Sequence, residues 1–272
     1  MTKGLRNMPK VLVNDINMYY EMKGNGFPIV MIMGLAGNAN WWDAELIEEL
    51  SKDYKTIVFD NRGVARTDNN DADFTMKDLA DDTVGLMDAL NIEKAHIMGI
   101  SMGGVVAQEL AINYPERVEK LILCSTSCGG AHFVMPEPRV LGILAAGRGD
   151  KTQEEFSRAT TFLLYPEQFM KDHPEIVEER LQIRLQNPIA DNTYKRQAKS
   201  IFAITTGEGL QNLNIPTLVL HGKQDILIPP GNGEKIAELI PGAKLQLFEK
   251  TGHALFSIET DTVIKAVVDF LK

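Results

Sequence analysis

Three residues of this sequence have the types and the order that acyl-transfer chemistry requires. Ser101 lies at the centre of the pentapeptide Gly-Ile-Ser-Met-Gly, Asp225 lies in the loop-like segment 221–229, and His253 follows a glycine near the end of the chain. A serine hydroxyl becomes a nucleophile when an imidazole takes its proton and a carboxylate orients that imidazole. The sequence therefore predicts a nucleophile, an acid and a base in the chain order Ser, Asp, His.

The position of Ser101 between an apolar run and a helix predicts a strained turn. Residues 95–98 are typical of a buried strand, and residues 105–113 have the apolar spacing of a packed helix. Gly99, Gly103 and Gly104 are the small neighbours that such a turn needs. The turn would place the hydroxyl at a helix N-terminus, where free N–H groups favour a developing anion. The alternative is a glycine-rich turn with an ordinary serine, and the acid and base that follow argue against it.

Asp225 and His253 are the favoured acid and base because each lies shortly after an expected strand. Asp225 follows the strand at 216–220, and its other possible role is to cap a nearby helix; the loop after Leu123 offers no competing carboxylate. His253 follows the last expected strand, at 244–248. The other four histidines lie on the elbow strand, in a helical segment or at a strand end: His96, His132, His173 and His221.

The elements that must position these residues alternate between strands and helices. A hairpin at residues 11–22 comes first. After the hairpin we expect strands at 29–33, 56–59, 95–98, 118–123, 216–220 and 244–248, and helices at 41–50, 76–90, 105–113 and 260–271. This alternation predicts an α/β fold, with a parallel sheet covered on both faces and ligands beyond the carboxyl ends of its strands.

The region 127–210 breaks the alternation, because it contains helical segments and no strand-like run. The expected helices lie at 138–146, 152–164, 174–186 and 193–204. The insertion leaves the sheet at the carboxyl end of one strand and returns for the next, so we expect a helical cap, or lid, over Ser101. Residues 1–126 and 211–272 are the expected core. A solvated decoration is the alternative for the insertion.

Composition excludes several other classes of function. The 28 basic and 37 acidic residues give a net charge of −9, and without a long basic run they give nucleic-acid binding little support. The first ten residues are polar, and no apolar stretch reaches membrane-spanning length, so we expect a cytoplasmic protein without a membrane span. Cys124 and Cys128 are expected to be reduced structural thiols rather than a redox or metal site. No metal and no cofactor is predicted.

Five ordered motifs together resemble the α/β-hydrolase superfamily over nearly the whole chain. They are Met33-Gly34-Leu35-Ala36, Asp60-Asn61-Arg62-Gly63, Gly99 to Gly104, His221-Gly222 through Asp225, and Gly252-His253. The nearest resemblance is to serine esterases and enzymes similar to 3-oxoadipate enol-lactonase. It implies a mostly parallel eight-stranded sheet with helices on both faces and a helical lid.

The resemblance also implies an oxyanion hole and shows two departures. The backbone N–H groups of Leu35 and Met102 would bind the oxyanion. Family members often have His-Gly where this chain has Met33-Gly34, and Gly-x-Ser where it has residues 65–67. Backbone donors survive a side-chain change, so Met33 is compatible with activity. Asp60 and Arg62 are interpreted as structural residues of their loop.

The predicted function is hydrolysis of an ester, lactone or thioester of a small, largely apolar substrate through an acyl-enzyme on Ser101. The expected pocket residues are Met33, Trp41, Trp42, Met135, Arg139 and Phe162, with Arg139 able to bind a substrate carboxylate. Enol-lactone hydrolysis, carbon–carbon bond hydrolysis and perhydrolysis remain open, because they would use the same three residues. A ligand-binding receptor on the same fold is the alternative from another class. The oligomeric state stays open.

Overall fold

A computed structural model describes residues 9–272; the first eight residues, which belong to the polar N-terminal segment and to the expected core, lie outside the described residues. Eight strands form one sheet in the order β1-β2-β4-β3-β5-β6-β7-β8. The strands are β1 (Lys10–Val13), β2 (Ile16–Lys23), β3 (Phe27–Ile32), β4 (Tyr54–Phe59), β5 (Ala95–Ile100), β6 (Val118–Cys124), β7 (Thr217–Gly222) and β8 (Lys244–Phe248). β2 pairs antiparallel with β1 and β4, and the other neighbours are parallel. The predicted α/β fold with a mostly parallel eight-stranded sheet is confirmed.

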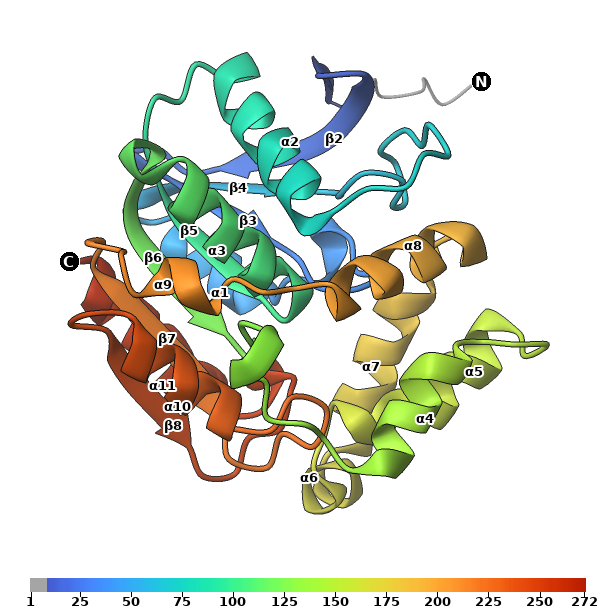
Figure 1. Cartoon of the computed structure of the whole chain (residues 1–272). Coiled ribbons are helices and arrows are strands. Elements are labelled where there is room, and N and C mark those ends of the chain that lie inside the picture. Colours follow the sequence, from blue (N-terminus) through green and yellow to red (C-terminus); the bar gives the residue numbers. More distant parts are fainter. Residues whose placement is uncertain (1–8) are drawn as a thin grey trace.

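Helices cover both faces of this sheet (Figure 1). They are α1 (Ala44–Leu50), α2 (Met76–Ala89), α3 (Met102–Asn113), α4 (Pro138–Ala146), α5 (Gln153–Thr160), α6 (Glu167–Asp172), α7 (Pro174–Leu185), α8 (Asp191–Phe202), α9 (Gly207–Leu210), α10 (Gly231–Leu239) and α11 (Thr260–Leu271). Buried side chains of α2, α3 and α10 pack with one face of the sheet, and those of α1 and α11 pack with the other. Burial of these two apolar clusters provides the main driving force for folding.

Two of the expected helices differ from the observed ones. The helix expected at 41–50 is a 3₁₀ turn at Ala39–Trp41, an extended Trp42 and then α1, because the Asn38 side chain caps the first turn by accepting a hydrogen bond from Asn40 N–H. The expected helix at 152–164 ends as α5 at Thr160 and continues as a 3₁₀ turn. The short helices α6 and α9, of 6 and 4 residues, were not predicted, because so few residues carry no periodic signal.

The segment between β6 and β7 contains α4 to α8, which lie on the right of Figure 1, with α8 above the other four. Hydrogen bonds tie α8 to the loops of the core: the Gln197 side chain accepts from Ala36 N–H at 2.9 Å, and Arg196 donates to Asn69 at 2.9 Å. By contrast α9 packs against α3 and α10. The last residues of the expected cap therefore lie against the core.

Asp60 and Arg62, in the loop after β4, make buried polar contacts that hold this loop. The Asp60 carboxylate accepts from Ala39 N–H at 2.8 Å and from Arg66 Nε at 2.7 Å. The Arg62 guanidinium donates to both oxygens of Asp82 on α2, at 2.8 and 2.7 Å. Such bidentate pairs fix geometry as well as charge, which accounts for a structural role of both residues.

His96 on β5 should make the protein less stable in mild acid. It is 4% exposed, its ring lies 4.8 Å from that of Phe27, and burial lowers its pKa from 6.5 to about 4. Between these values the unfolded chain binds the additional proton, so the free energy of unfolding should fall as the pH drops from 6.5 to about 4, by on the order of 3 kcal/mol. Urea unfolding of wild type and His96→Leu across this range measures it. If both proteins lost stability at the same rate, His96 would not be the cause.

Cys124 and Cys128 are free thiols, and both are buried. Burial raises the pKa of each thiol and so lowers the fraction of reactive thiolate. Within residues 9–272 no helix combines the length and the apolar character needed to cross a membrane.

Candidate active site

Ser101 lies at a strained turn between β5 and α3. Its backbone has φ 56° and ψ −124°, which is unfavourable for a residue with a side chain. The turn is held by two hydrogen bonds: Ser101 N–H donates to Cys124 O at 2.9 Å, and the Thr126 hydroxyl donates to Ser101 O at 2.7 Å. The surrounding structure thus enforces the conformation that presents the serine hydroxyl to the cavity.

The elbow glycines are required by close backbone approaches. A Cβ atom on Gly99 would lie 2.2 Å from Gly103 O, and one on Gly103 would lie 2.0 Å from Ile32 O. Both distances are shorter than any contact that a real Cβ atom makes, and the opposing atoms belong to the backbone, which cannot rotate away. These glycines therefore allow α3 to start directly against β3 and β5.

Gly103→Ala should destabilise the protein by about 3 kcal/mol or more, because the added methyl group displaces β3 or α3. Gly142→Ala is the matched control, since Gly142 lies inside α4 with nothing within 4 Å of the added atom. There the better helix propensity of alanine should be neutral or add up to about 1 kcal/mol. Urea unfolding midpoints measure both effects. Equal stabilities of Gly103→Ala and wild type would contradict the close approach.

His253 and Asp225 are joined by a short hydrogen bond. His253 Nδ1 lies 2.7 Å from Asp225 Oδ2, and both side chains are buried. The other carboxylate oxygen accepts the backbone N–H groups of Leu227 and Ile228, each at 2.9 Å. Asp225 is therefore fixed from both sides, and it fixes in turn which nitrogen of His253 faces the cavity.

The charge state of Asp225 follows from these contacts. Burial alone would raise its pKa, but the charge of His253 and hydrogen bonds from His221 and His253 outweigh burial and lower the pKa to about 2. His221 is fully buried and directs Nε2 to Ile228 O at 2.8 Å, with Asp225 Oδ2 3.5 Å away. At neutral pH the carboxylate is ionised, as a group that stabilises an imidazolium must be.

The sequence assigns an oxyanion hole to the backbone N–H groups of Leu35 and Met102. Met102 is the first residue of α3, so its N–H has no partner within the helix. The backbone hydrogen bonds found among residues 9–272 include none donated by Leu35 N–H. Gly34 brings that loop close to the serine, since a Cβ atom on Gly34 would lie 3.6 Å from Ser101 Oγ. Both N–H groups are therefore free beside the serine hydroxyl.

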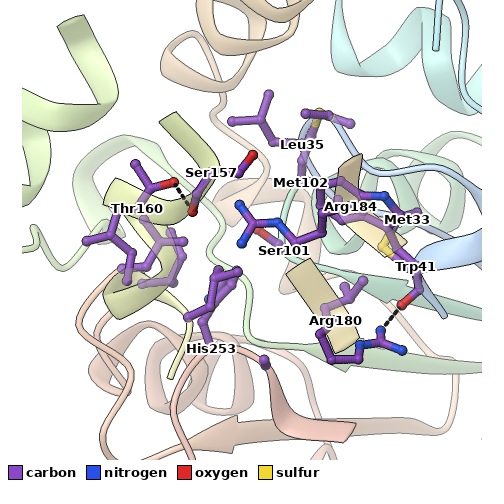
Figure 2. Close-up of a pocket in the computed structure, with 18 of the residues that line it drawn as sticks. Met33, Leu35, Trp41, Ser101, Met102, Ser157, Thr160, Arg180, Arg184 and His253 are labelled. Carbon is purple, nitrogen blue, oxygen red and sulfur yellow. Dashed lines mark hydrogen bonds between the residues drawn. The ribbon is translucent and has the colours of Figure 1, made fainter. Parts of the chain in front are cut away.

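Ser101 and His253 line one cavity of about 270 Å³ between the sheet and α4, α5, α7 and α8 (Figure 2). No hydrogen bond joins the two side chains in the part of the chain that the structure describes. Most of the wall is apolar. Its apolar members include Met33, Leu35, Trp41, Trp42, Ile100, Leu144, Phe156, Leu163, Leu164, Tyr165 and Ile183. Helices of the segment 127–210 thus form a large part of the cavity wall.

Three of the expected pocket residues lie outside this cavity, so these three expectations are wrong: Met135, Arg139 and Phe162. Met135 is 58% exposed. Arg139 is exposed in the first turn of α4 and pairs with Glu137 at 3.2 Å. Phe162 points toward Arg139, whose Cζ atom is 6.0 Å from the Phe162 ring, while the next residue, Leu163, faces the cavity. Met33, Trp41 and Trp42 do line the cavity.

Sequence reasoning missed two polar residues near the site, Arg184 and Gln197. Arg184 on α7 lines the cavity, and Gln197 on α8 holds the backbone N–H of Ala36, next to the oxyanion loop. Helical periodicity could have placed their helices but not the side of each helix that meets the core. Within residues 9–272 no group of three or more His, Cys, Asp or Glu side chains could hold a metal ion.

The fold and the site define a hydrolase of the alpha/beta hydrolase fold. The family model of that description matches residues 28–260, so the chain belongs to this family. A provisionally named carbamate hydrolase, RutD, from Azorhizobium caulinodans is 28% identical over 97% of this chain and 98% of its own length.

Two solved structures are also similar over nearly their whole length. The enol-lactonase from Burkholderia xenovorans LB400 has a TM-score of 0.85 and 25% identity, covering 97% of this chain and 99% of that one. A thermophilic esterase from Thermogutta terrifontis, solved with malate bound, has a TM-score of 0.82 and 26% identity, covering 97% of each chain. These similarities support hydrolysis as the class of reaction.

Proposed function

We propose that this chain is a serine hydrolase that cleaves a carboxylic ester of a small, largely apolar substrate through an acyl-enzyme on Ser101. One observation carries the proposal: the elbow serine and the Asp225-bound imidazole of His253 face the same cavity, beside two free N–H groups. A structural serine would need neither the strained backbone nor the paired imidazole. The names of the similar proteins described above refer to a carbamate, an enol lactone and an ester. Each of these substrates has a carbonyl carbon bonded to a leaving group.

The reaction has two steps. His253 takes the hydroxyl proton as Ser101 Oγ attacks the carbonyl carbon, and the oxyanion that forms accepts hydrogen bonds from Leu35 and Met102 N–H. The tetrahedral intermediate collapses, the alkoxide leaves with the proton from His253, and the acyl group stays on Ser101. Water, deprotonated by His253, then attacks the acyl carbon; the bond from that carbon to Ser101 Oγ breaks, His253 returns the proton to Oγ, and the acid leaves. Asp225 remains ionised throughout and stabilises the imidazolium.

The cavity favours a small substrate with apolar parts. Its volume of about 270 Å³ and its mainly apolar wall fit a short acyl chain or an aryl group. Trp41 and Trp42 lie on the side of the oxyanion loop, and Leu144 and Phe156 come from the cap helices. The substrate is therefore enclosed between core and cap.

The experiment is a series of p-nitrophenyl esters of rising acyl chain length, with Ser101→Ala as the blank. We expect turnover with a clear optimum at a short chain, because longer chains outgrow the cavity. Turnover of an enol lactone or a carbon–carbon substrate, but of no ester in the series, would replace the ester proposal while keeping the nucleophile. Reaction of wild type with a fluorophosphonate but turnover of no substrate would favour the receptor alternative.

A further inference from the structure

Arg184 directs a guanidinium into the active-site cavity without a partner for its charge. Its side chain extends from α7 toward the side of the cavity on which Ser101 and His253 lie (Figure 2). Its Nε atom is fully buried and has no hydrogen-bond partner. Across residues 9–272 no carboxylate lies within ion-pair distance of this side chain. The charge therefore lacks the compensation that burial normally demands.

Three other buried or half-buried arginines of this protein are compensated. Arg62 pairs with Asp82 at 2.7 Å, and Arg66 pairs with Asp60 at 2.7 Å. Arg180, one turn before Arg184 on α7, donates to the carbonyl oxygen of Trp41 and lies 3.7 Å from Asp43. Arg184 is thus an exception on its own helix, and structural packing alone does not account for it.

The neighbours of Arg184 orient the guanidinium without neutralising it. Its Cζ atom lies 5.5 Å from the centre of the Trp41 ring, which attracts a cation through its face and leaves the N–H edge free. Burial, with the nearby charge of Arg180, lowers the pKa of Arg184, yet a guanidinium stays protonated at neutral pH. The site therefore holds a permanent positive charge that is ready to accept an anion.

The other charged residues of the cavity wall also favour binding of an anion. Arg148, Arg180 and Arg184 line it, against the carboxylates of Asp43 and Asp191. Both carboxylates are already engaged, Asp43 with Ser257 at 3.2 Å and Asp191 with Lys195 at 2.7 Å. A positive excess inside a protein of net charge −9 favours an anionic ligand at this place.

We propose that Arg184 binds a carboxylate of the substrate, so that the preferred substrates are esters that also carry a free carboxylate group. This inference rests on the proposed serine hydrolase function and names the substrate class of the same cavity. A planar guanidinium with a free edge matches a carboxylate with two parallel hydrogen bonds. Arg184 takes the part that the sequence assigned to Arg139.

Two pairs of matched esters test the preference. Mono-p-nitrophenyl glutarate carries the carboxylate on the acyl side, and 4-(butyryloxy)benzoate carries it on the alcohol side; the methyl ester of each is its neutral counterpart. We expect wild type to prefer the anionic member of at least one pair in kcat/KM. In Arg184→Met that preference should fall by about tenfold to a hundredfold, the range of one charge-assisted hydrogen bond. Any fall in kcat/KM for the neutral esters should be smaller than for the anionic ones, and an unfolding midpoint in urea close to that of wild type shows that the variant is folded.

Arg139→Met is the control for loss of a positive charge, because Arg139 is exposed and lies outside the cavity. It should keep the wild-type preference. The inference would be overturned if wild type had equal kcat/KM for the anionic and neutral members of both pairs. It would also be overturned if the preference for the anionic member survived in Arg184→Met.

A binding measurement separates this inference from the proposed function. Calorimetry of glutarate binding to Ser101→Ala requires no turnover, and we expect binding that Arg184→Met, added to Ser101→Ala, weakens by about tenfold or more. Absence of binding would overturn the anion site. Failure of the proposed function would show differently, as hydrolysis of the neutral esters that persists in Ser101→Ala.

Discussion

Ser101→Ala should lower kcat for a good ester by about 10⁴ to 10⁶, the loss that removal of a nucleophile causes in a serine hydrolase. Without the hydroxyl no acyl-enzyme can form, and only the oxyanion donors and substrate binding remain to accelerate direct attack by water. KM should change little, because the removed hydroxyl oxygen is a small part of a mainly apolar cavity wall. Steady-state kinetics on the best p-nitrophenyl ester measure both constants.

The control for this substitution is Ser157→Ala. Ser157 also lines the cavity, and its side chain is buried on α5. Removal of the Ser157 hydroxyl should change kcat far less than removal of the Ser101 hydroxyl does, because only packing is disturbed. If Ser157→Ala and Ser101→Ala had equal effects, the elbow serine would have no special part in the reaction.

Asp225→Asn should lower kcat by about 10⁴ while leaving the fold intact. The amide is isosteric, but its NH₂ group cannot accept the His253 Nδ1 proton at the 2.7 Å position. The imidazole would then be held in the wrong tautomer, and its protonated form would lose the neighbouring charge. The defect should be present at about pH 5 and at about pH 8, because a pKa of about 2 keeps the wild-type carboxylate ionised at both.

The stability of the two proteins supplies the complementary measurement. Because the folded-state pKa of Asp225 is lowered, its ionisation stabilises the fold above the unfolded pKa near 3.8, and this contribution is lost as the pH falls toward 2. Any stability difference between wild type and Asp225→Asn should therefore shrink below about pH 4. A kcat for Asp225→Asn close to that of wild type would contradict the role assigned to the carboxylate.

The parts of the site that could be predicted from the sequence are those set by local features. Strand, turn and helix around Ser101 lie within about twenty residues, and glycine at 99 and 103 is needed for contacts inside that unit and with β3. Asp225 and His253 each follow a strand directly, and parallel strands bring their carboxyl ends to one edge. The α/β fold could be predicted for the same reason, since the strands and the helices that join them each have their own apolar periodicity, and only the connection between β6 and β7 is long.

The cavity could not be predicted, because it depends on how the helices of the segment 127–210 are rotated against the sheet and its loops. The contact that joins Gln197 to Ala36 spans most of the chain, and nothing near either residue indicates it. Arg139 and Arg184 have the same residue type and both lie on helices of the segment 127–210, yet one faces outward and the other lines the cavity. Only the packed structure distinguishes them.

Labelling with a fluorophosphonate, followed by peptide mapping, tests the central claim most directly. The reagent forms a stable bond with a serine that is activated by an imidazole, and the account predicts one phosphonyl group per chain on Ser101 Oγ, with activity lost in proportion. Labelling should be absent in Ser101→Ala. Full loss of activity with the phosphonyl group on another residue, or full activity with Ser101 labelled, would contradict the account.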